Sequence, residues 1–570
     1  MEPDPEPAKG WALFDLISRS KYSARPEVDI GVDRAAHRRF LIFAAGVLGV
    51  FLVSRLWWLG SWVHLLNDEA IELHRALLIH ADLGNLWLPN VEFKPPFFYW
   101  LAAVMVGVFD DPVVALRMIS VGASLLTLVV LMFFVCQTSG RRTALLAASL
   151  YVLSPYGLVF DRTGFMETFL AFLLFSSCVL LITGRAGLRP DIRSVFCGFL
   201  LGLAFFTKQS ALLFFPFPLL WTLLGRRRCL SAWAGLGVIY ATAGLFIVLF
   251  VTAPDISSIW AARGVPGDGT SAVLYHASYR LSVSEILGFP WSIWFDNALV
   301  MMRIAAEHFT IPIVGLALLA GLVSRHRKST VAVFLFAATP LAVMVIIANG
   351  MSGRAYMFSF LIAPLSILAA EAAIQIGSFV SGKYGLIRGR ATTVFIACVV
   401  VSVGIAKDIP LMVRPLGVLE GMQEGLLAAP NISEFRVQEA AERLIEIAQE
   451  QPIYVLTDLS FGMPTDGLAV FLWGRNEVGL VYTWWINSES IPLVPEEPIE
   501  MFQSNHHRTS DRTTLGRRQL QKRRVYWITN SVRYPAEFVR LKSPECELVF
   551  SLASPDGSSL DLYLVSTPDR

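Results

Sequence analysis

Long apolar segments separated by short polar ones occupy most of the chain from residue 40 to residue 410. An α-helix needs about twenty predominantly apolar residues to cross the hydrocarbon core of a bilayer. The pattern therefore predicts a polytopic α-helical membrane protein with about eleven transmembrane helices. The segments that approach or exceed the required length are 40–60, 114–137, 143–161, 164–184, 194–207, 211–225, 231–253, 308–324, 330–349, 355–378 and 391–410.

Two of these segments are too short to be ordinary spans. They are 194–207 and 211–225, and Pro216 and Pro218 interrupt the second. Interrupted helices at membrane depth are tolerated only where they are buried in protein or line a cavity. We expect one of those two environments for this part of the chain.

Basic residues between the apolar segments predict the orientation. Cytoplasmic loops of membrane proteins are enriched in Lys and Arg. With the N-terminus in the cytoplasm, every basic cluster falls inside, provided that the apolar segment 97–109 does not cross. We therefore expect 97–109 to be a juxtamembrane or re-entrant helix and the C-terminus to lie outside. The clusters are Arg34–Arg39, Arg141-Arg142, Arg185–Arg193, Arg226–Arg228, Arg325–Lys328 and Lys383–Arg390.

The last 160 residues have a different character, with shorter apolar runs and more charge. Residues 434–451 have the pattern of an amphipathic helix. The stretches 452–459, 480–486, 524–529, 546–553 and 560–566 are predicted as strands, the last two forming a hairpin around Asp556-Gly557. The basic stretch 504–524 is expected to be a mobile loop. These features predict a soluble α/β domain.

The chain is thus expected to have three parts. A cytoplasmic N-terminal tail covers 1–39. A transmembrane domain covers 40–410, with outer loops at 61–113 and 254–305. An extracytoplasmic α/β domain covers 411–570.

Composition agrees with a membrane protein. Of 570 residues, 55% are hydrophobic and 16% charged, and mean hydropathy is +0.56. The formal net charge of +2 is too small to indicate a nucleic-acid partner. The six cysteines are scattered, with neither a disulfide framework nor zinc-ligand spacing.

The stretch 67–100 is unusually polar for this chain. Asp68, Glu69 and Glu72 open a helical segment, and Lys94 stands before Pro95-Pro96. Ionisable groups near a bilayer are costly, so they favour a functional interpretation. The alternative is a solvated juxtamembrane helix whose acids only stabilise its N-terminus.

Three motifs in this stretch resemble a known superfamily. They are Asp68-Glu69-Ala70, Lys94-Pro95-Pro96 and Tyr99-Trp100-Leu101. This arrangement is similar to the polyprenyl-phosphate-dependent glycosyltransferases of the GT-C superfamily, in particular the bacterial lipid A aminoarabinose transferases and the protein O-mannosyltransferase-like enzymes. Many relatives have Glu directly before the Lys. This chain has Phe93 there, so a metal-binding role for that Glu is not carried over.

The resemblance implies roles for three acids. Asp68 matches the proposed base, which removes a proton from the acceptor hydroxyl. Glu69, its neighbour, points elsewhere on a helix and is expected to orient or support it. Glu167 stands where the family's Arg-x-x-x-x-Asp stretch has its Asp, and it would hold sugar hydroxyls, the acceptor or a metal ion. The alternative for this stretch is a local pairing, Asp161 with Arg162 or Arg162 with Glu167, that closes the turn.

The resemblance also implies four cations for the donor phosphate. They are Lys94, Arg162, Lys208 and Arg354. A cation in a partly desolvated place stabilises the charge that grows on a departing phosphate. Lys208 lies in a stretch like the family's Gly-Leu-Ala-x-x-Thr-Lys-Gly, with Gln209 in place of the last Gly. The alternative is that Lys94 and Lys208 only anchor the chain at the membrane interface.

These observations favour an inverting membrane glycosyltransferase. It would take a sugar from a polyprenyl-phosphate donor in the bilayer and pass it in one displacement to a lipid, glycan or protein acceptor on the outer face. A bacterial inner membrane with a periplasmic site is expected, with the eukaryotic endoplasmic reticulum as the alternative. A divalent metal cofactor is left open, and no residue is assigned as a metal ligand.

Two other functions are compatible with a polytopic chain. A transporter or lipid flippase would place ionisable groups and broken helices near the bilayer midplane, in related halves. An assembly protein would use its outer domain to bind a partner. The gathering of charge at one face and the lack of a paired half favour the enzyme.

Overall fold

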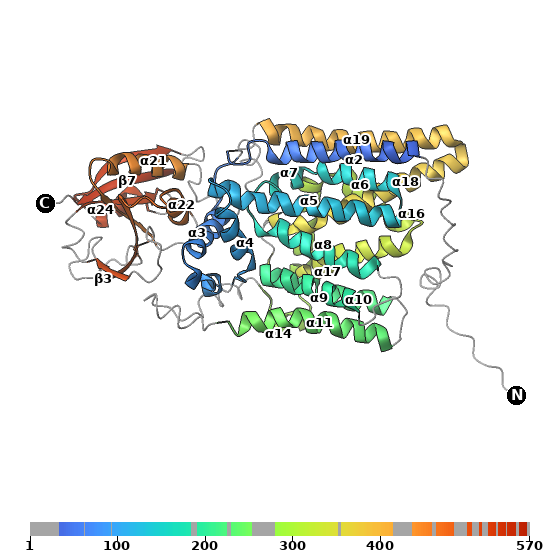
Figure 1. Cartoon of the computed structure of the whole chain (residues 1–570), viewed down its shortest axis with the longest axis horizontal. Coiled ribbons are helices and arrows are strands. Elements are labelled where there is room, and N and C mark those ends of the chain that lie inside the picture. The colour runs from blue at the N-terminus through green and yellow to red at the C-terminus, as the bar shows by residue number, and fades with distance from the viewer. Residues whose placement is uncertain are drawn as a thin grey trace.

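The computed structural model describes two parts joined by a short helical layer. It covers residues 34–61, 63–92, 94–183, 191–224, 230–253, 280–350, 355–413, 436–458, 463–483, 499–503, 512–515, 523–531, 534–542, 544–553 and 558–566. A helical bundle lies at one end and a sheet domain at the other, with α3 (Asn67–Ala81) and α4 (Phe97–Val106) between them (Figure 1).

The remaining elements of the helical part follow in chain order. Two 3-10 helices, η1 (Leu83–Asn85) and η2 (Leu88–Glu92), connect α3 to α4. The other helices are α2 (Arg34–Leu56), α5 (Pro112–Thr138), α6 (Arg141–Val152), α7 (Pro155–Phe160), α8 (Met166–Thr183), α9 (Ile192–Thr207), η3 (Gln209–Phe214), α10 (Pro216–Leu224), α11 (Leu230–Val251), α14 (Val283–Leu287), α15 (Trp291–Phe309), α16 (Ile311–Val323), α17 (Arg327–Ile347), η4 (Ala355–Leu361), α18 (Ile362–Tyr384) and α19 (Leu386–Val413).

The predicted polytopic membrane protein is confirmed at this coarser level. Among the described residues, seven helices are long and apolar enough to cross a bilayer, or eight if the bent pair α15 and α16 counts as one span. The apolar segment 97–109 forms the short helix α4, which is not among these spans, as expected for a juxtamembrane or re-entrant helix. The total of eleven spans stays a prediction.

Two expected spans are divided in the structure. The segment 143–161 forms α6 and α7, because the Ser154 hydroxyl accepts from the Gly157 N–H and Pro155 begins a new helix. The segment 211–225 forms η3 and α10, which meet at Pro216. Proline lacks a backbone N–H and favours the first turn of a helix over its interior.

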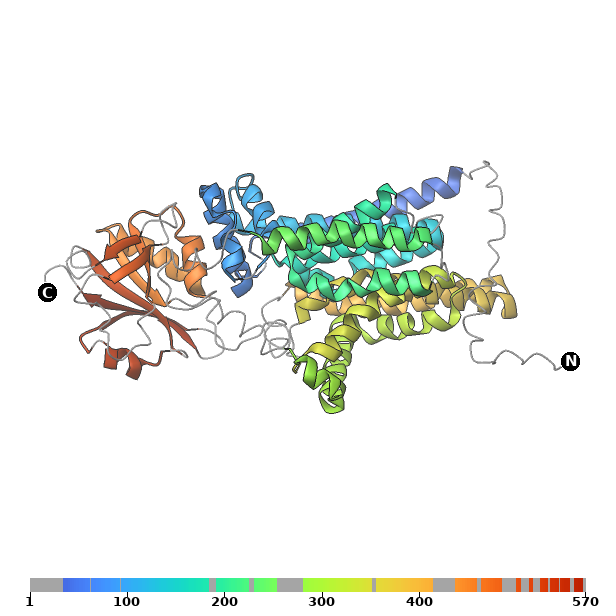
Figure 2. The same ribbon diagram turned by 90° about the horizontal axis from the view of Figure 1, so that it is seen from below.

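The most buried span is Met357–Tyr384, which contains α18 and lies at the centre of the bundle. The spans formed by α2 and α19 are the least buried and lie at its edge. Ala369, Ala370 and Ala372 are fully buried on α18, and side chains this small let neighbouring helices approach closely. In Figure 2 the yellow-green helices near residue 300 project from one side of the bundle.

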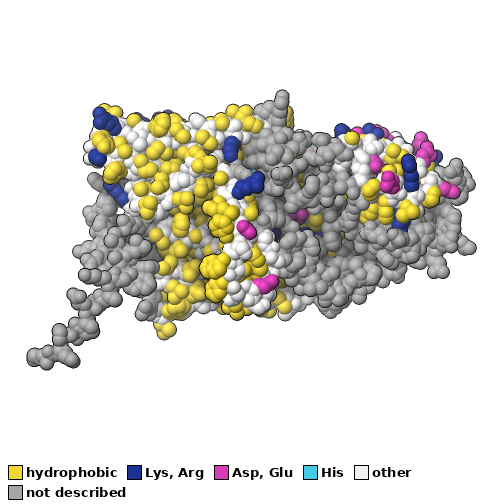
Figure 3. All heavy atoms as spheres, turned by 180° about the vertical axis from the view of Figure 1, so that it is seen from behind, with side chains coloured by type: hydrophobic (Ala, Val, Ile, Leu, Met, Phe, Trp, Pro, Cys, Tyr) yellow, Lys and Arg dark blue, Asp and Glu magenta, His cyan; other side chains and the backbone are white. Residues whose placement is uncertain are grey.

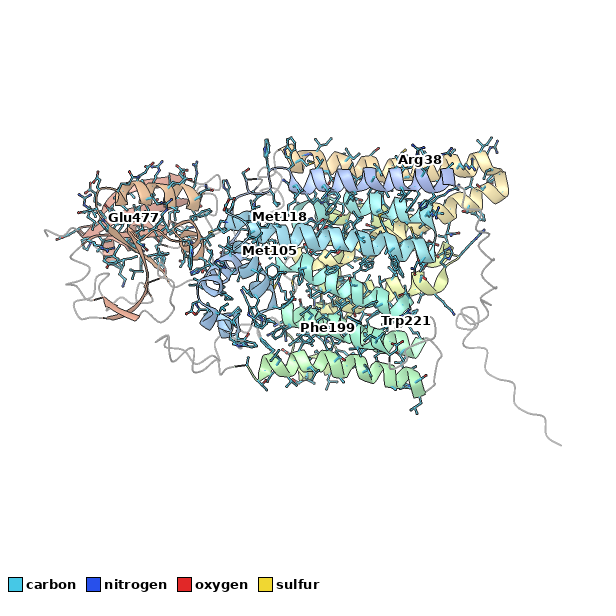
Figure 4. The ribbon with its side chains drawn as sticks, in the orientation of Figure 1. Arg38, Met105, Met118, Phe199, Trp221 and Glu477 are labelled. Carbon is cyan, nitrogen blue, oxygen red and sulfur yellow. The ribbon has the colours of Figure 1, made fainter. Side chains whose placement is uncertain are left out.

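The surface of the bundle has two distinct regions. Hydrophobic side chains dominate it, and a group of Lys and Arg side chains lies at the end away from the sheet domain (Figure 3). Arg38 of α2 also lies at that end (Figure 4), as does the connection from α18 to α19 with Lys383 and Arg388. In the view of Figure 3, further Lys and Arg side chains and the Asp and Glu side chains of the bundle lie toward the sheet domain.

The sheet domain contains seven strands and three helices among its described residues. Its sheet has the order β4-β3-β2-β1-β5-β7-β6. The elements are α21 (Val437–Ala448), β1 (Ile453–Asp458), α22 (Thr465–Phe471), β2 (Val478–Thr483), β3 (Ile499–Gln503), β4 (Arg512–Leu515), β5 (Arg524–Asn530), α24 (Ala536–Lys542), β6 (Glu547–Ala553) and β7 (Ser559–Ser566).

Strand β1 is central and parallel to both neighbours, β2 and β5, whereas the other pairs are antiparallel. Ile453, Val455 and Leu456 of β1 are fully buried, as expected for a strand covered on both faces. The expected helix, the hairpin β6–β7 and the strand at 524–529 are present, and the turn Asp556-Gly557 lies outside the described residues. An α/β domain is therefore confirmed.

The structure differs from the sequence prediction in three details. Residues 512–515 form β4 within the expected loop 504–524, where Thr513 and Thr514 supply β-branched side chains without an apolar run. Strand β2 begins at Val478, two residues before the expected start. Helix α2 begins at Arg34 inside the expected tail, because no helix breaker lies between Arg34 and the apolar run.

Candidate active site at the start of α3

Asp68 and Glu72 lie on the same face of α3, because residues four apart on a helix are neighbours. Asp68 is half-buried in the first turn, whereas only 4% of Glu72 is exposed. No donor among the described residues meets Glu72 Oε2. The first two turns of α3 therefore present two carboxyl groups side by side, one of them inside the protein.

Glu69 has a different environment from Asp68. Its carboxylate forms a bidentate ion pair with Arg117 of α5, with Nε–Oε1 and Nη2–Oε2 distances of 2.9 Å. It also accepts from the backbone N–H groups of Gly164, at 2.5 Å, and Leu66, at 2.9 Å. Bidentate Arg–carboxylate pairs fix orientation as well as adding energy. Glu69 thus joins the start of α3 to α5 and to the turn before α8, which fits the supporting role.

The turn between α7 and α8 is anchored to α2. Asp161 is fully buried and pairs with Arg55, with an Nε–Oδ2 distance of 3.3 Å. Arg162 is also fully buried, and its Nη2 donates to the carbonyl of Trp57. Asp161 therefore pairs with a distant arginine rather than with its neighbour, and Arg162 is held against the end of α2.

Glu167 and Lys208 form an ion pair between the first turn of α8 and the end of α9. The Glu167 side chain is 5% exposed and the Lys208 side chain 28% exposed. A carboxylate so buried needs a partner, and an ammonium group on a flexible stem provides it. The two residues predicted from separate motifs are thus in direct contact.

The charges of Glu167 and Lys208 act on Glu72, so both side chains lie near α3. Burial raises the pKa of Glu72 well above its usual range, and the nearby carboxylates of Glu167 and Asp68 raise it further, against Lys208 and Lys94. Each charge must lie close to Glu72 to act in this way. We call Asp68, Glu72, Lys94, Glu167 and Lys208 the polar cluster.

Lys94 joins the polar cluster from the loop between η2 and α4. Its backbone N–H donates to the carbonyl of Pro89, at 3.1 Å, and its side chain is half-buried. Burial and the nearby Arg75 lower the pKa of Lys94, and the carboxylates of Asp68 and Glu72 oppose this. The amine therefore lies among the acids of α3.

Glu167 is one of the residues that line a small, mostly apolar cavity. Its walls come from α8, η3, α17 and η4, and a second small cavity shares Ala171, Ser359 and Phe360 with it. Leu213 and Phe214 of the interrupted segment 211–225 line the first cavity, as expected for that segment, and so does Ser210 directly before it. The other lining residues are Leu170, Ala171, Leu174, Met344, Met357, Ser359 and Phe360.

The polar cluster, as defined above, does not include two of the predicted cations. Arg162 contacts Trp57, and Arg354 lies outside the described residues. Glu72 was not assigned a role from sequence, although its spacing from Asp68 was a usable signal. Arg117 was also missed, and its signal was a charge inside the apolar segment 114–137.

No three His, Cys, Asp or Glu side chains come close enough to hold a metal ion in the part of the chain that the structure describes. The described residues therefore supply no ready-made metal site.

Comparison with known proteins links this arrangement to a family. Residues 93–257 match the model of the dolichyl-phosphate-mannose-protein mannosyltransferase family. No curated protein sequence matches the chain significantly.

Solved structures extend the likeness to the whole chain. ArnT from Cupriavidus metallidurans in the apo state aligns with 93% of this chain and 98% of its own, at 16% identity and a TM-score of 0.58. The same protein bound to undecaprenyl phosphate aligns over 92% and 97%, at 16% identity and a TM-score of 0.54. At such identity the likeness concerns the fold.

The family match over 93–257 and the shared fold together point to a glycosyltransferase. The chain therefore has the fold of a GT-C glycosyltransferase over nearly its whole length, and the resemblance to this superfamily is confirmed.

Proposed function

We propose that the protein transfers a sugar from a polyprenyl-phosphate donor to an acceptor hydroxyl at the outer face of a membrane, with inversion at the anomeric carbon. The observation that carries this proposal is the position of Glu167. It belongs to the polar cluster, pairs with Lys208 and also lines the apolar cavity. A polyprenyl phosphate has the matching form, with an anionic head on an apolar chain.

The reaction is a single displacement. The acceptor oxygen attacks the anomeric carbon while the bond from that carbon to the phosphate oxygen breaks, and the phosphate departs with the electron pair. Asp68, half-buried at the start of α3, takes the acceptor proton. Glu69 positions this base through Arg117. Glu167 holds the sugar or the acceptor.

Charge on the departing phosphate is balanced by the lysines. Lys94 and Lys208 come from different elements and both act on the pKa of Glu72, so both lie near the base. Cations placed where negative charge develops are worth more in a partly desolvated site than in water. Arg162 and Arg354 remain proposed phosphate ligands. For Arg162, this requires that its guanidinium leave the Trp57 carbonyl when the donor binds.

The direction of the chain follows from its charge. Basic side chains gather at the end of the bundle away from the sheet domain (Figure 3). By the positive-inside rule that end is cytoplasmic, and α3 and the sheet domain lie on the outer side. We place the protein in a bacterial inner membrane, with its site in the periplasm. ArnT bound to undecaprenyl phosphate supports a lipid-linked donor.

The test compares Asp68→Asn with Asp82→Asn. Asp82 is an exposed acid at the other end of α3, so its variant controls for removing an acid from this helix. Purified proteins are incubated with radiolabelled polyprenyl-phosphate sugars and a membrane extract that supplies acceptors, and free polyprenyl phosphate is measured. We expect release by wild type and Asp82→Asn only.

Equal release by Asp68→Asn would remove Asp68 as the base and leave Glu167 as the next candidate. Movement of labelled lipid across a vesicle bilayer, without release of the sugar, would favour the flippase instead.

A further inference from the structure

The sheet domain contacts α3 through a buried hydrogen bond. His74 Nδ1 and Asp466 Oδ1 are 2.6 Å apart, and their side chains are 10% and 8% exposed. His74 lies on α3, two residues after Glu72, and Asp466 lies in the first turn of α22. A buried pair of this kind restrains both helices, because breaking it leaves a polar group without its partner.

A second hydrogen bond holds the first residue of α3. The backbone N–H of Met463 donates to Asn67 Oδ1, at 2.7 Å. Asn67 directly precedes Asp68, the proposed base. The chain from 463 to 466 therefore contacts α3 both at its start and about two turns later, on either side of the two acids.

Apolar packing extends the same contact. Trp473 lies edge-on to His74, with ring centroids 6.4 Å apart, and packs against Leu78 and Leu88. Asn67, His74 and Leu78 together span most of α3. The sheet domain thus contacts this helix along its length.

The position of this contact in the sheet domain has a structural reason. The segment before α22 follows the carboxyl end of β1, the central parallel strand, and Thr457 of β1 hydrogen-bonds Thr465, at 2.9 Å. In open α/β sheets, loops at the carboxyl ends of parallel strands form the binding edge. In this protein, residues at that edge contact α3 of the same chain.

We propose that the sheet domain is part of the catalytic unit: through His74 and Asn67, Asp466 and the Met463 backbone hold α3 so that Asp68 faces the sugar donor, and Asp466 adds negative charge opposite Lys94. Asp466 is a positioning residue. This inference rests on the proposed function of Asp68 and Lys94 as base and phosphate cation.

The charge of Asp466 acts on Lys94 together with groups of α3. Burial and Arg75 lower the pKa of Lys94, whereas Asp68, Glu72 and Asp466 raise it. Lys94 must be protonated to balance the phosphate. Loss of Asp466 would therefore move the alkaline limit of activity to lower pH.

Two measurements on the full chain test the proposal with Asp466→Asn, Asp466→Glu and His74→Ala. Hydrogen exchange of the α3 amides needs no substrate, so it reports on docking even if the transferase assignment fails. The pH profile of transfer reports on Lys94. The matched control is Asp561→Asn, which removes a buried acid of the same domain that bonds Ser551 on the neighbouring strand β6.

We expect faster exchange in α3 for Asp466→Asn and His74→Ala. We also expect a fall in kcat of about a hundredfold, the order that a misplacement of ~1 Å can cost, and an alkaline limit at lower pH for Asp466→Asn. Asp466→Glu, which restores the charge, should return the alkaline limit toward the wild-type value. Asp561→Asn should retain wild-type exchange in α3 and the wild-type pH profile.

Unchanged exchange in Asp466→Asn would overturn the docking role. Faster exchange with wild-type kcat and an unmoved pH profile would overturn the positioning role. A wild-type protein that transfers no sugar would overturn the proposed function and the catalytic part of this inference, while exchange would still decide whether Asp466 holds α3.

Discussion

Arg117 on α5 and Glu69 on α3 form a fully buried bidentate ion pair, with both N–O distances at 2.9 Å. The pair lies one residue from the proposed base and fixes the position of the first turn of α3. Removing one partner leaves an uncompensated charge inside the protein, which is more costly than losing the attraction itself.

Breaking this pair should destabilise the protein strongly. We expect Arg117→Met and Glu69→Gln each to lower the free energy of unfolding by about 3–5 kcal/mol, and the double variant to lose less than the sum, because it leaves no unpaired charge. Denaturant unfolding in detergent measures this. Arg443→Ala, which breaks an exposed pair with Glu439, should cost less than about 1 kcal/mol. Additive losses in the double variant would show that the two side chains act independently.

Gly164 should tolerate no side chain. A Cβ there would lie 2.5 Å from Leu116 and 3.3 Å from Glu69 Oε1. Gly164→Ala should therefore destabilise the protein by about 1–3 kcal/mol and lower transfer by displacing Glu69. Gly122→Ala is the control, since nothing lies within 4 Å of its Cβ on the helix α5. Thermal unfolding and transfer rates compare the two, and similar behaviour of both variants would contradict the close approach.

Glu72 should make the protein less stable as pH rises. Burial, Glu167 and Asp68 raise its pKa in the folded protein, so above its unfolded pKa the folded state retains a proton that the unfolded state releases. In that window stability falls with rising pH by about 1.4 kcal/mol per unit.

Glu72→Gln removes this loss, so the variant should be at least as stable as wild type at pH 7 and less dependent on pH from the unfolded pKa upward. Unfolding measured from pH 4 to pH 8, on the order of the range in which a buried carboxyl titrates, tests this. Glu446→Gln, on the exposed face of α21, should keep the wild-type profile. A steeper fall in Glu72→Gln would mean that the Glu72 carboxyl is ionised in the folded protein.

Lys94 should contribute to the chemical step. We expect Lys94→Met to lower kcat/KM for transfer by about 10²–10³-fold, the range found when one group that stabilises a developing anion is removed. Lys383→Met, in the last turn of α18 at the other end of the bundle, should keep the wild-type rate. Steady-state kinetics with a polyprenyl-phosphate sugar separates the two, and a change in KM alone would assign Lys94 to ground-state binding.

The membrane segments could be predicted because a span must be apolar over its whole length. The breaks inside the spans were harder to place. New helices begin at Pro155 and Pro216, although the apolar pattern of the sequence continues across both residues. In the sheet domain, β1, β5 and β7 carry apolar runs and were predicted, whereas the short strands β3 and β4 depend on pairing with each other at the sheet edge.

Motif resemblance predicted Asp68, Lys94, Glu167 and Lys208, and the structure brings these four together. It could not predict Arg117, because the partner of Glu69 is 48 residues away in sequence and depends on helix packing. Motif resemblance also could not predict the contact of His74 with Asp466, because a hydrogen bond between distant segments leaves no local pattern in the sequence.

The hydrogen bond between His74 and Asp466 joins residues separated by 392 positions. When α19 has been synthesised, Glu69 and Arg117 are both present in the nascent chain, whereas Asp466 has still to be made. The contact of His74 with Asp466 therefore cannot form until the segment that follows α19 has been synthesised and α22 has folded. The contact between α3 and α22 therefore forms late in the synthesis of the protein.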